Sequence, residues 1–93
     1  MINVVVLSAS TRKALRKCPP QIVRNFTGWV GSVQRVGLER TRLVPGYHDE
    51  PLKGEWLGYR SIRLNKAYRA IYSIRNDAIV EFALVETINK HQY

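Results

Sequence analysis

Residues 59–74 read YRSIRLNKAYRAIYSI, and the fold of the chain follows from how this stretch alternates. Its first six residues alternate as a β-strand does, with Ile62 and Leu64 on one face and Arg63 on the other. A short turn, NKA, separates them from a second run, YRAIYSI, that has a similar character. The stretch therefore predicts an antiparallel hairpin with one apolar face turned toward a core.

The pattern continues on both sides of this hairpin. A second turn at residues 75–77 leads to a third run at residues 78–85, so the three runs predict an antiparallel meander. Upstream, residues 37–58 have little periodicity and are rich in turn formers, which predicts an ordered loop.

The first third of the chain has helical periodicity after one short apolar run. Residues 2–7 are rich in β-branched side chains and predict a buried strand. Residues 11–17 predict a first helix, and residues 20–36 predict a second, because apolar residues recur there at spacings of three and four. The expected order is β-α-α-β-β-β. The fold class is α+β, an antiparallel sheet with two helices packed on one face and the other face partly open.

The length and net charge of the chain limit its number of domains and the kinds of partner that it attracts. Ninety-three residues predict a single domain, 1–93. Fifteen basic against seven acidic residues give a net charge of +8, a field that attracts nucleic acid, an anionic membrane surface or an acidic protein. One cysteine allows no internal disulfide, and no secretory signal or membrane span is predicted. We therefore expect a cytoplasmic protein with no membrane partner.

Two arginines of the hairpin are candidates for binding phosphate. Arg63 is expected on the open face, and Arg69 follows two residues after the turn. A one-residue slip in register would turn Arg69 to the other face. If both lie on the open face, they repel each other unless an anion binds between them, and a phosphate fits two guanidinium groups. The alternative is a pair of exposed arginines bonded to Glu81 and Glu86.

The chain closes with NKHQY, which offers an imidazole at His91 and a phenol at Tyr93. Both groups transfer protons, and beside two arginines they would suit RNA cleavage by 2′-OH attack on the adjacent phosphorus. The alternative is a solvated tail. There is no zinc-type Cys/His spacing and no glycine-rich phosphate loop, and one adjacent acidic pair is too little for a two-metal nuclease. We therefore expect chemistry without a metal or other cofactor.

The stretch EPLKGEWLGYRSIRLNKAYRAIY, at residues 50–72, and the terminal KHQY resemble the RelE/ParE superfamily of bacterial toxins, which belong to type II toxin–antitoxin systems. The resemblance extends along the whole chain in element order and favours the RelE/YoeB-type mRNA interferase branch. It implies a microbial-RNase-like fold. It also implies a metal-independent endoribonuclease that cleaves mRNA in the A site of the 70S ribosome. A cognate antitoxin would neutralise it, and the pair would bind its own operator DNA.

The resemblance also assigns roles to residues. Arg69 matches the arginine that contacts the scissile phosphate, Arg63 a basic residue on the preceding strand, and Glu50 a proposed general base. His91 and Tyr93 match a terminal His-Tyr pair, although Gln92 separates them here. The predicted RNA or phosphate contacts are Lys53, Arg60, Lys66 and Lys90. Ser61 stands where RelE has a lysine, which removes one candidate base.

Two other functions remain open at this point. A ParE-like toxin shares the fold but acts by binding DNA gyrase, and its toxicity would not need the C-terminal tail. A basic nucleic-acid-binding module without toxin activity would bind in a salt-sensitive way and would not cleave.

Overall fold

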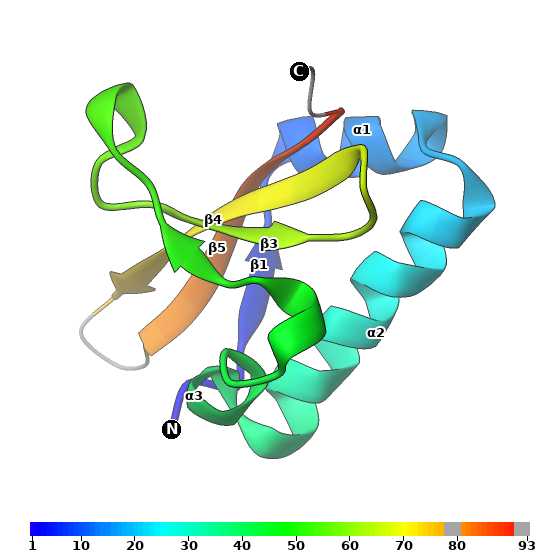
Figure 1. Ribbon diagram of the computed structural model, residues 1–93. Coiled ribbons are helices and arrows are strands. Elements are labelled where there is room, and N and C mark those ends of the chain that lie inside the picture. Colours follow the sequence, from blue (N-terminus) through cyan, green and yellow to red (C-terminus); the bar gives the residue numbers. More distant parts are fainter. Residues whose placement is uncertain (78–80, 91–93) are drawn as a thin grey trace.

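The computed structural model describes residues 1–77 and 81–90, and the fold is stated for these residues. The elements follow in this order: β1 (Val5–Leu7), α1 (Ala9–Lys17), α2 (Pro20–Val36), α3 (Leu38–Thr41), η1 (Pro45–Tyr47), β2 (Glu50–Pro51), η2 (Gly54–Trp56), β3 (Arg60–Arg63), β4 (Tyr68–Asn76) and β5 (Glu81–Lys90). The elements η1 and η2 are single 3₁₀ turns inside the predicted loop. Figure 1 shows this arrangement.

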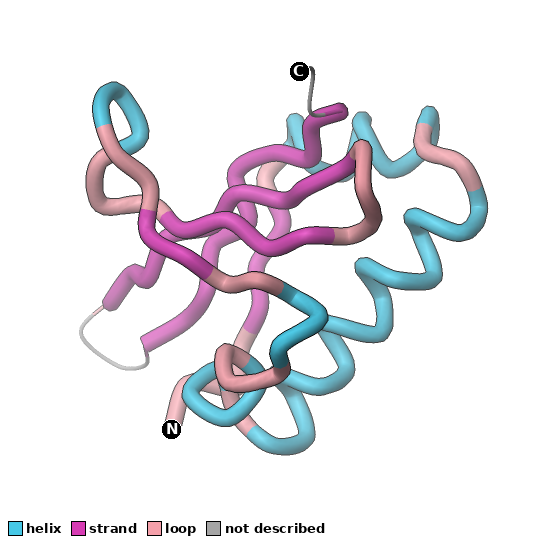
Figure 2. The backbone as a smooth tube through the Cα atoms, in the orientation of Figure 1, coloured by secondary structure: helices cyan, strands magenta, loops and turns pink. Residues whose placement is uncertain are grey.

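The strands form one sheet in the order β1-β5-β4-β3-β2. The meander β3-β4-β5 is antiparallel, as the sequence predicts, whereas β1 pairs with β5 in parallel. The sheet is therefore mixed and not antiparallel throughout. The reason is that β1 and β5 are joined through the whole intervening chain, including α1, α2 and α3, so no hairpin constrains their directions. Figure 2 shows the strands gathered in one layer beside the long helix α2. The α+β class is confirmed.

The core lies between the helices and one face of the sheet. Helix α2 buries its apolar stripe, and the rings of Trp29 and Tyr72 lie 5.4 Å apart across the interface between helix and sheet. The ring of Phe26 stacks on Trp29 at 6.1 Å. All three side chains are at most 2% exposed. Aromatic contacts of this kind fix α2 against β4, the strand that carries Arg69.

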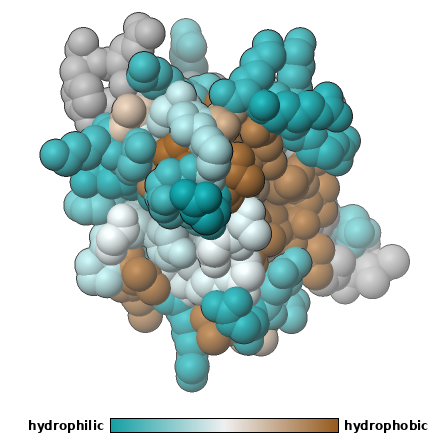
Figure 3. All heavy atoms as spheres, turned by 90° about the vertical axis from the view of Figure 1, so that its right-hand side faces the viewer, coloured by the Kyte–Doolittle hydropathy of each residue, from teal (hydrophilic) through white to brown (hydrophobic). Residues whose placement is uncertain are grey.

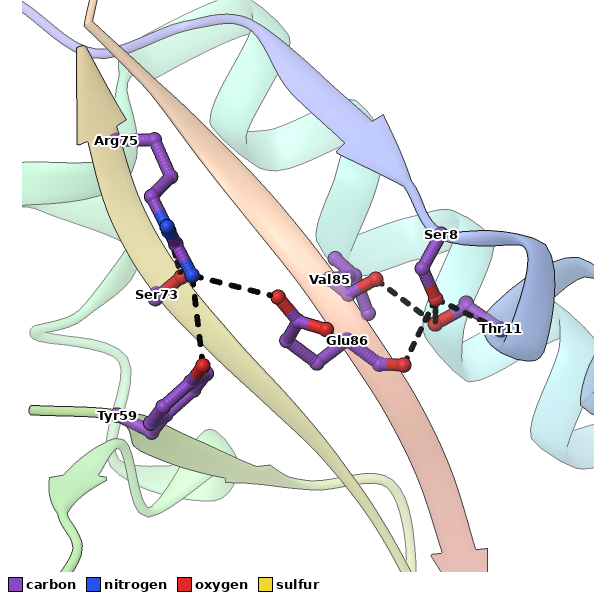
Figure 4. A network of polar contacts seen from close by, with 7 residues as sticks. All are labelled: Ser8, Thr11, Tyr59, Ser73, Arg75, Val85 and Glu86. Atoms are coloured by element: carbon purple, nitrogen blue, oxygen red, sulfur yellow. Dashed lines mark hydrogen bonds and ion pairs between the residues drawn. The ribbon is translucent and has the colours of Figure 1, made fainter. Parts of the chain in front are cut away.

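Helix α1 is anchored to β5 at its first turn. The Ser8 hydroxyl accepts a hydrogen bond from the Thr11 backbone N–H at 3.0 Å and donates one to the Glu86 carbonyl at 2.7 Å. The Thr11 hydroxyl donates to the Val85 carbonyl at 2.9 Å. Figure 4 shows these contacts at the right of the view. The helix cap thus also joins two elements that are far apart in sequence.

Strand β5 (Glu81–Lys90) ends five residues later than the predicted run at residues 78–85, of which residues 78–80 lie outside the described part of the chain. Its pairing with β4 continues to Tyr68 opposite Lys90, with one irregularity in the register between Ile71 and Tyr72. Strand β5 is extended because it pairs with β4 along its length. This is a long-range effect, which the local alternation of residue types does not predict. The predicted site residues His91 and Tyr93 lie outside the described residues.

Apolar and hydrophilic areas share the surface. Figure 3 shows an apolar area beside hydrophilic side chains on the side of the molecule that carries α2. The exposed large apolar side chains of the chain include Val4, Val6 and Val36. Within residues 1–77 and 81–90, no helix has the length and apolar character that a membrane span needs.

Candidate functional site

The hairpin β3-β4 places Arg63 and Arg69 directly opposite each other. Their Cα atoms are register partners in an antiparallel ladder, so the two side chains project from the same face of the sheet. The register that the sequence leaves open is thus settled in favour of a pair. On β5, Asn89 is the register partner of Arg69 and extends this row to a third strand. Two like charges directly opposite each other destabilise a sheet unless an anion offsets them.

These arginines line a pocket of about 120 Å³, here called the arginine pocket. The lining residues are His48, Glu50, Ser61, Arg63, Asn65, Lys66, Tyr68 and Arg69. Glu50 of β2 pairs with Ser61 of β3, which brings the carboxylate to the face that carries both arginines. The pocket therefore combines two guanidinium groups, one ammonium group, one carboxylate, one imidazole, one amide and two hydroxyls.

The guanidinium group of Arg69 has a hydrogen-bond donor that no acceptor in the described part of the chain uses. Its Nε atom is buried and has no hydrogen-bond partner among the described residues. Neither Arg63 nor Arg69 forms an ion pair within residues 1–77 and 81–90. A buried N–H without a partner costs about 1–3 kcal/mol, so a site that keeps one is suited to a ligand that supplies the acceptor.

His48 enters the pocket through an unusual backbone conformation. Its φ of 45° and ψ of 46° lie in the left-handed region, and no other non-glycine residue among those described has a positive φ. Its backbone N–H caps η1 by donating to the Pro45 carbonyl at 3.1 Å. Sequence reasoning offered little basis for selecting His48. The dipeptide HD after a P-G turn was the one available signal, because histidine and aspartate tolerate this conformation better than most residues.

The residue after His48 anchors the pocket wall to the core. The Asp49 side chain is fully buried, and its carboxylate accepts hydrogen bonds from Arg60 Nε at 2.6 Å and from the Tyr72 hydroxyl at 2.5 Å. Burial by itself lowers the pKa of Arg60, but the hydrogen bond and charge of Asp49 outweigh this effect, and the pKa is raised overall. Arg60 thus stays charged and fixes the loop that carries His48 and Glu50 onto β3 and β4.

This anchor predicts a loss of stability in alkali. Burial, followed by the hydrogen bond to Asp49 and the charge of Asp49, raises the pKa of Tyr72 well above its usual value of 10.0. The stability that this shift contributes is fully present below pH 10 and is lost as the pH rises above it, because only the unfolded chain releases the proton there. Urea unfolding of the wild type should show a free energy of unfolding that falls by about 1.4 kcal/mol per pH unit above pH ~10. Tyr72→Phe should remove this component of the slope, and an unchanged slope would contradict the prediction.

A second arginine on β4 is already paired. Arg75 Nη2 lies 3.6 Å from Glu86 Oε1, and Arg75 also donates to the hydroxyls of Ser73 at 2.9 Å and Tyr59 at 3.4 Å. Figure 4 shows Arg75 and Glu86 directed toward each other between β4 and β5. Glu86 therefore neutralises Arg75, and the two arginines of the pocket form no ion pair with it.

The other predicted phosphate contacts fall in different places. Lys66 lines the arginine pocket. Lys90 is an exposed residue at the end of β5, opposite Tyr68, which also lines the pocket. Lys53 is exposed at the start of η2 and is not among the lining residues. Arg60 is not brought to this pocket either, because its guanidinium group binds Asp49.

Among the described residues, no group of three or more His, Cys, Asp or Glu side chains is arranged to hold a metal ion.

The fold is similar to that of several solved bacterial toxins. A YoeB/ParE toxin from Agrobacterium tumefaciens superposes with a TM-score of 0.72 at 20% sequence identity, covering 96% of this chain and 99% of that chain. YafQ from E. coli has a TM-score of 0.70 at 19% identity, covering 94% and 91%. A chain of a YoeB–YefM complex from Staphylococcus aureus has a TM-score of 0.68 at 19% identity, covering 95% of each chain. No protein-family model matches the chain, and no curated protein matches it. The chain thus has the fold of the RelE/YoeB-type toxins.

Proposed function

We propose that this protein is the toxin of a type II toxin–antitoxin system and acts as a ribosome-dependent, metal-independent mRNA endonuclease. The observation that carries the proposal is the pair Arg63 and Arg69, placed opposite each other in a pocket with Arg69 Nε unpartnered. The fold shared with solved toxins supports the same conclusion.

In the proposed reaction the two guanidinium groups hold the scissile phosphate. A base takes the proton of the 2′-OH, the 2′ oxygen attacks phosphorus, the bond to the 5′ oxygen breaks, and an acid protonates that oxygen. Arg63 and Arg69 would stabilise the negative charge that builds on the phosphoryl oxygens, which is commonly worth 10²–10³-fold in rate per donor. Glu50 is the carboxylate of the pocket and the candidate base.

The proposal assigns the remaining proton transfer to the C-terminal residues His91 and Tyr93. The last described residue, Lys90, pairs with Tyr68, a lining residue of the arginine pocket, which supports this assignment. Histidine has a pKa near 6.5 in solution and can serve as acid or base at neutral pH. His48 is a second imidazole that already lines the pocket.

The proposed partners are the 70S ribosome with its message, and a cognate antitoxin that binds operator DNA together with the toxin. The net charge of +8 favours both a ribosomal RNA surface and an acidic inhibitor, which would then compete. The YoeB–YefM complex from Staphylococcus aureus is a solved toxin–antitoxin pair with this fold. Helix α1, which contacts β1, has four exposed basic residues, and Val6 of β1 and the preceding Val4 are exposed as well; this combination suits a partner with acidic and apolar side chains. The basic residues are Arg12, Lys13, Arg16 and Lys17.

The test is primer extension on a defined message in a purified translation system. The wild type should produce cuts confined to the A-site codon, and none on the same message without ribosomes. A chain ending at Lys90 should lose about 10²–10⁴-fold, the range for removing a general acid or base. Gln92→Ala, which keeps His91 and Tyr93, is the matched control and should cleave normally.

Two results would reject the nuclease assignment. An intact message with every chain, together with growth arrest in cells, would favour a toxin that acts on DNA gyrase. Salt-sensitive RNA binding without cleavage or growth arrest would favour a basic RNA-binding module.

A further inference from the structure

A second pocket adjoins the arginine pocket and shares Arg63 with it. It has a volume of about 360 Å³, against about 120 Å³ for the first, and is here called the side pocket. It lies between α2, the loop around η1 and the end of β3. The lining residues are Arg24, Asn25, Gly28, Val44, Gly46, Tyr47, Arg63 and Leu64.

The smaller arginine pocket suits the size of a phosphate group, and the larger side pocket suits the size of a nucleoside. Because Arg63 lines both, a group bound in the side pocket lies next to an anion bound between Arg63 and Arg69. The lining contains two arginines and no acidic side chain. Its positive charge therefore favours a polyanionic chain over a chain that has few negative charges or a positive net charge.

Asn25 presents an oriented amide to this pocket. Its Nδ2 donates to the Leu64 carbonyl at 2.7 Å, and its Oδ1 accepts from Gln21 Nε2 at 2.8 Å. These two bonds fix the plane of the amide and leave one N–H and one lone pair for another group. An amide with one donor and one acceptor to spare matches the hydrogen-bonding edge of a base.

Arg24 and Tyr47 supply the other two elements of base recognition. Arg24 Nη2 donates to Gln21 Oε1 at 2.8 Å, which steadies the guanidinium group and leaves its other N–H donors available. Tyr47 is half-buried and lines the pocket from the opposite side, in the loop around η1. Unstacked RNA bases are commonly bound by stacking on tyrosine rings or arginine planes.

Two glycines keep the side pocket open although packing does not require them. A Cβ atom at Gly28 or at Gly46 would meet no other atom within 4 Å. Gly28 lies inside α2, where glycine costs roughly 1 kcal/mol relative to alanine. Because Gly28 relieves no close contact, a larger side chain at this position can occupy the open space without disturbing the packing.

We propose that the side pocket binds the base and ribose of the nucleotide that flanks the phosphate held by Arg63 and Arg69. This inference rests on the proposed function, because it adds a subsite to the same RNA-binding site. A side chain of a protein partner is the competing occupant. The oriented amide, the two guanidinium groups and the shared Arg63 favour the nucleotide.

The test follows the backbone amide signals of Gly28 and Gly46 by NMR during two titrations of the full chain. Inorganic phosphate should shift signals of the arginine pocket and leave both glycines unmoved. A 2′-deoxy trinucleotide, which cannot be cleaved by 2′-OH attack, should shift both sets. Gly28→Leu fills the side pocket and should weaken trinucleotide binding ~10-fold, as for the loss of one stacked base, without changing phosphate binding.

Matched variants keep the result interpretable. Gln34→Leu adds the same side chain at an exposed position of α2 outside the pocket and should bind like the wild type. Arg24→Gln changes an exposed side chain and should also weaken only the trinucleotide. If phosphate binds to the wild type but the trinucleotide does not shift the two glycine signals, the side-pocket inference alone is overturned. A wild type that binds neither ligand overturns this inference together with the nuclease function. An acidic apolar peptide that shifts the glycine signals when the trinucleotide does not also overturns the inference.

Discussion

Replacing Arg69 with alanine is expected to lower A-site cleavage by about 10²–10³-fold and to leave the free energy of unfolding unchanged or slightly higher. The loss follows because Arg69 is the arginine with a buried, unpartnered Nε in the pocket. The stability follows because the substitution removes a like charge directly opposite Arg63. Arg69→Lys should recover only part of the rate, since an ammonium group cannot bind two phosphate oxygens as a guanidinium fork does.

The matched control is Arg40→Ala, which removes the same charge from an exposed position on α3 that lines neither pocket. Primer extension gives the rate, and urea unfolding gives the stability. Equal losses of cleavage in both variants would mean that net charge, and not the pocket, carries the effect. A large drop in stability for Arg69→Ala would show that the residue is structural.

The second large effect is expected at the ion pair of Asp49 and Arg60. The Asp49 side chain is 0% exposed and that of Arg60 is 21% exposed, so the two partners are not equivalent. Arg60→Met leaves a fully buried carboxylate without its counter-charge and should cost about 4–5 kcal/mol of unfolding free energy. Asp49→Asn leaves a guanidinium group that still reaches water and should cost about 3 kcal/mol.

A triple variant separates the cost of a broken pair from the value of an intact one. Asp49→Leu, Arg60→Met and Tyr72→Phe together remove the three polar side chains of this network, so no buried charge or buried polar side chain is left without its partner and most of the lost stability should return. Urea unfolding at pH 7 measures all three chains. If Arg60→Met costs less than Asp49→Asn, the assignment of Asp49 as the more buried partner is wrong. Cleavage by the folded triple variant would report whether the anchor also positions His48 and Glu50.

Local patterns predicted much of the architecture because helices and hairpins depend on neighbouring residues. The apolar spacing of three and four gave α2 with its bounds, and the strand alternation gave the hairpin that carries Arg63. The extent of β5 was not predictable in this way, since it depends on pairing with β4 along its whole length. The parallel contact of β1 with β5 is likewise a long-range choice.

The residues of the candidate site also fall into two groups, those that the sequence identifies and those that only the tertiary structure brings together. The sequence by itself singled out Arg63 and Arg69, because residue type and strand period are local properties. Glu50 and Lys66 were candidates through the resemblance to RelE/ParE toxins. Only the tertiary structure decided that Arg63 and Arg69 share a face and that Arg60 turns from phosphate binding to an ion pair with Asp49. It also brought His48 into the pocket and opened the space beside Arg63. The physical reason is that register, burial and charge pairing depend on residues distant in the chain, which a local pattern does not specify.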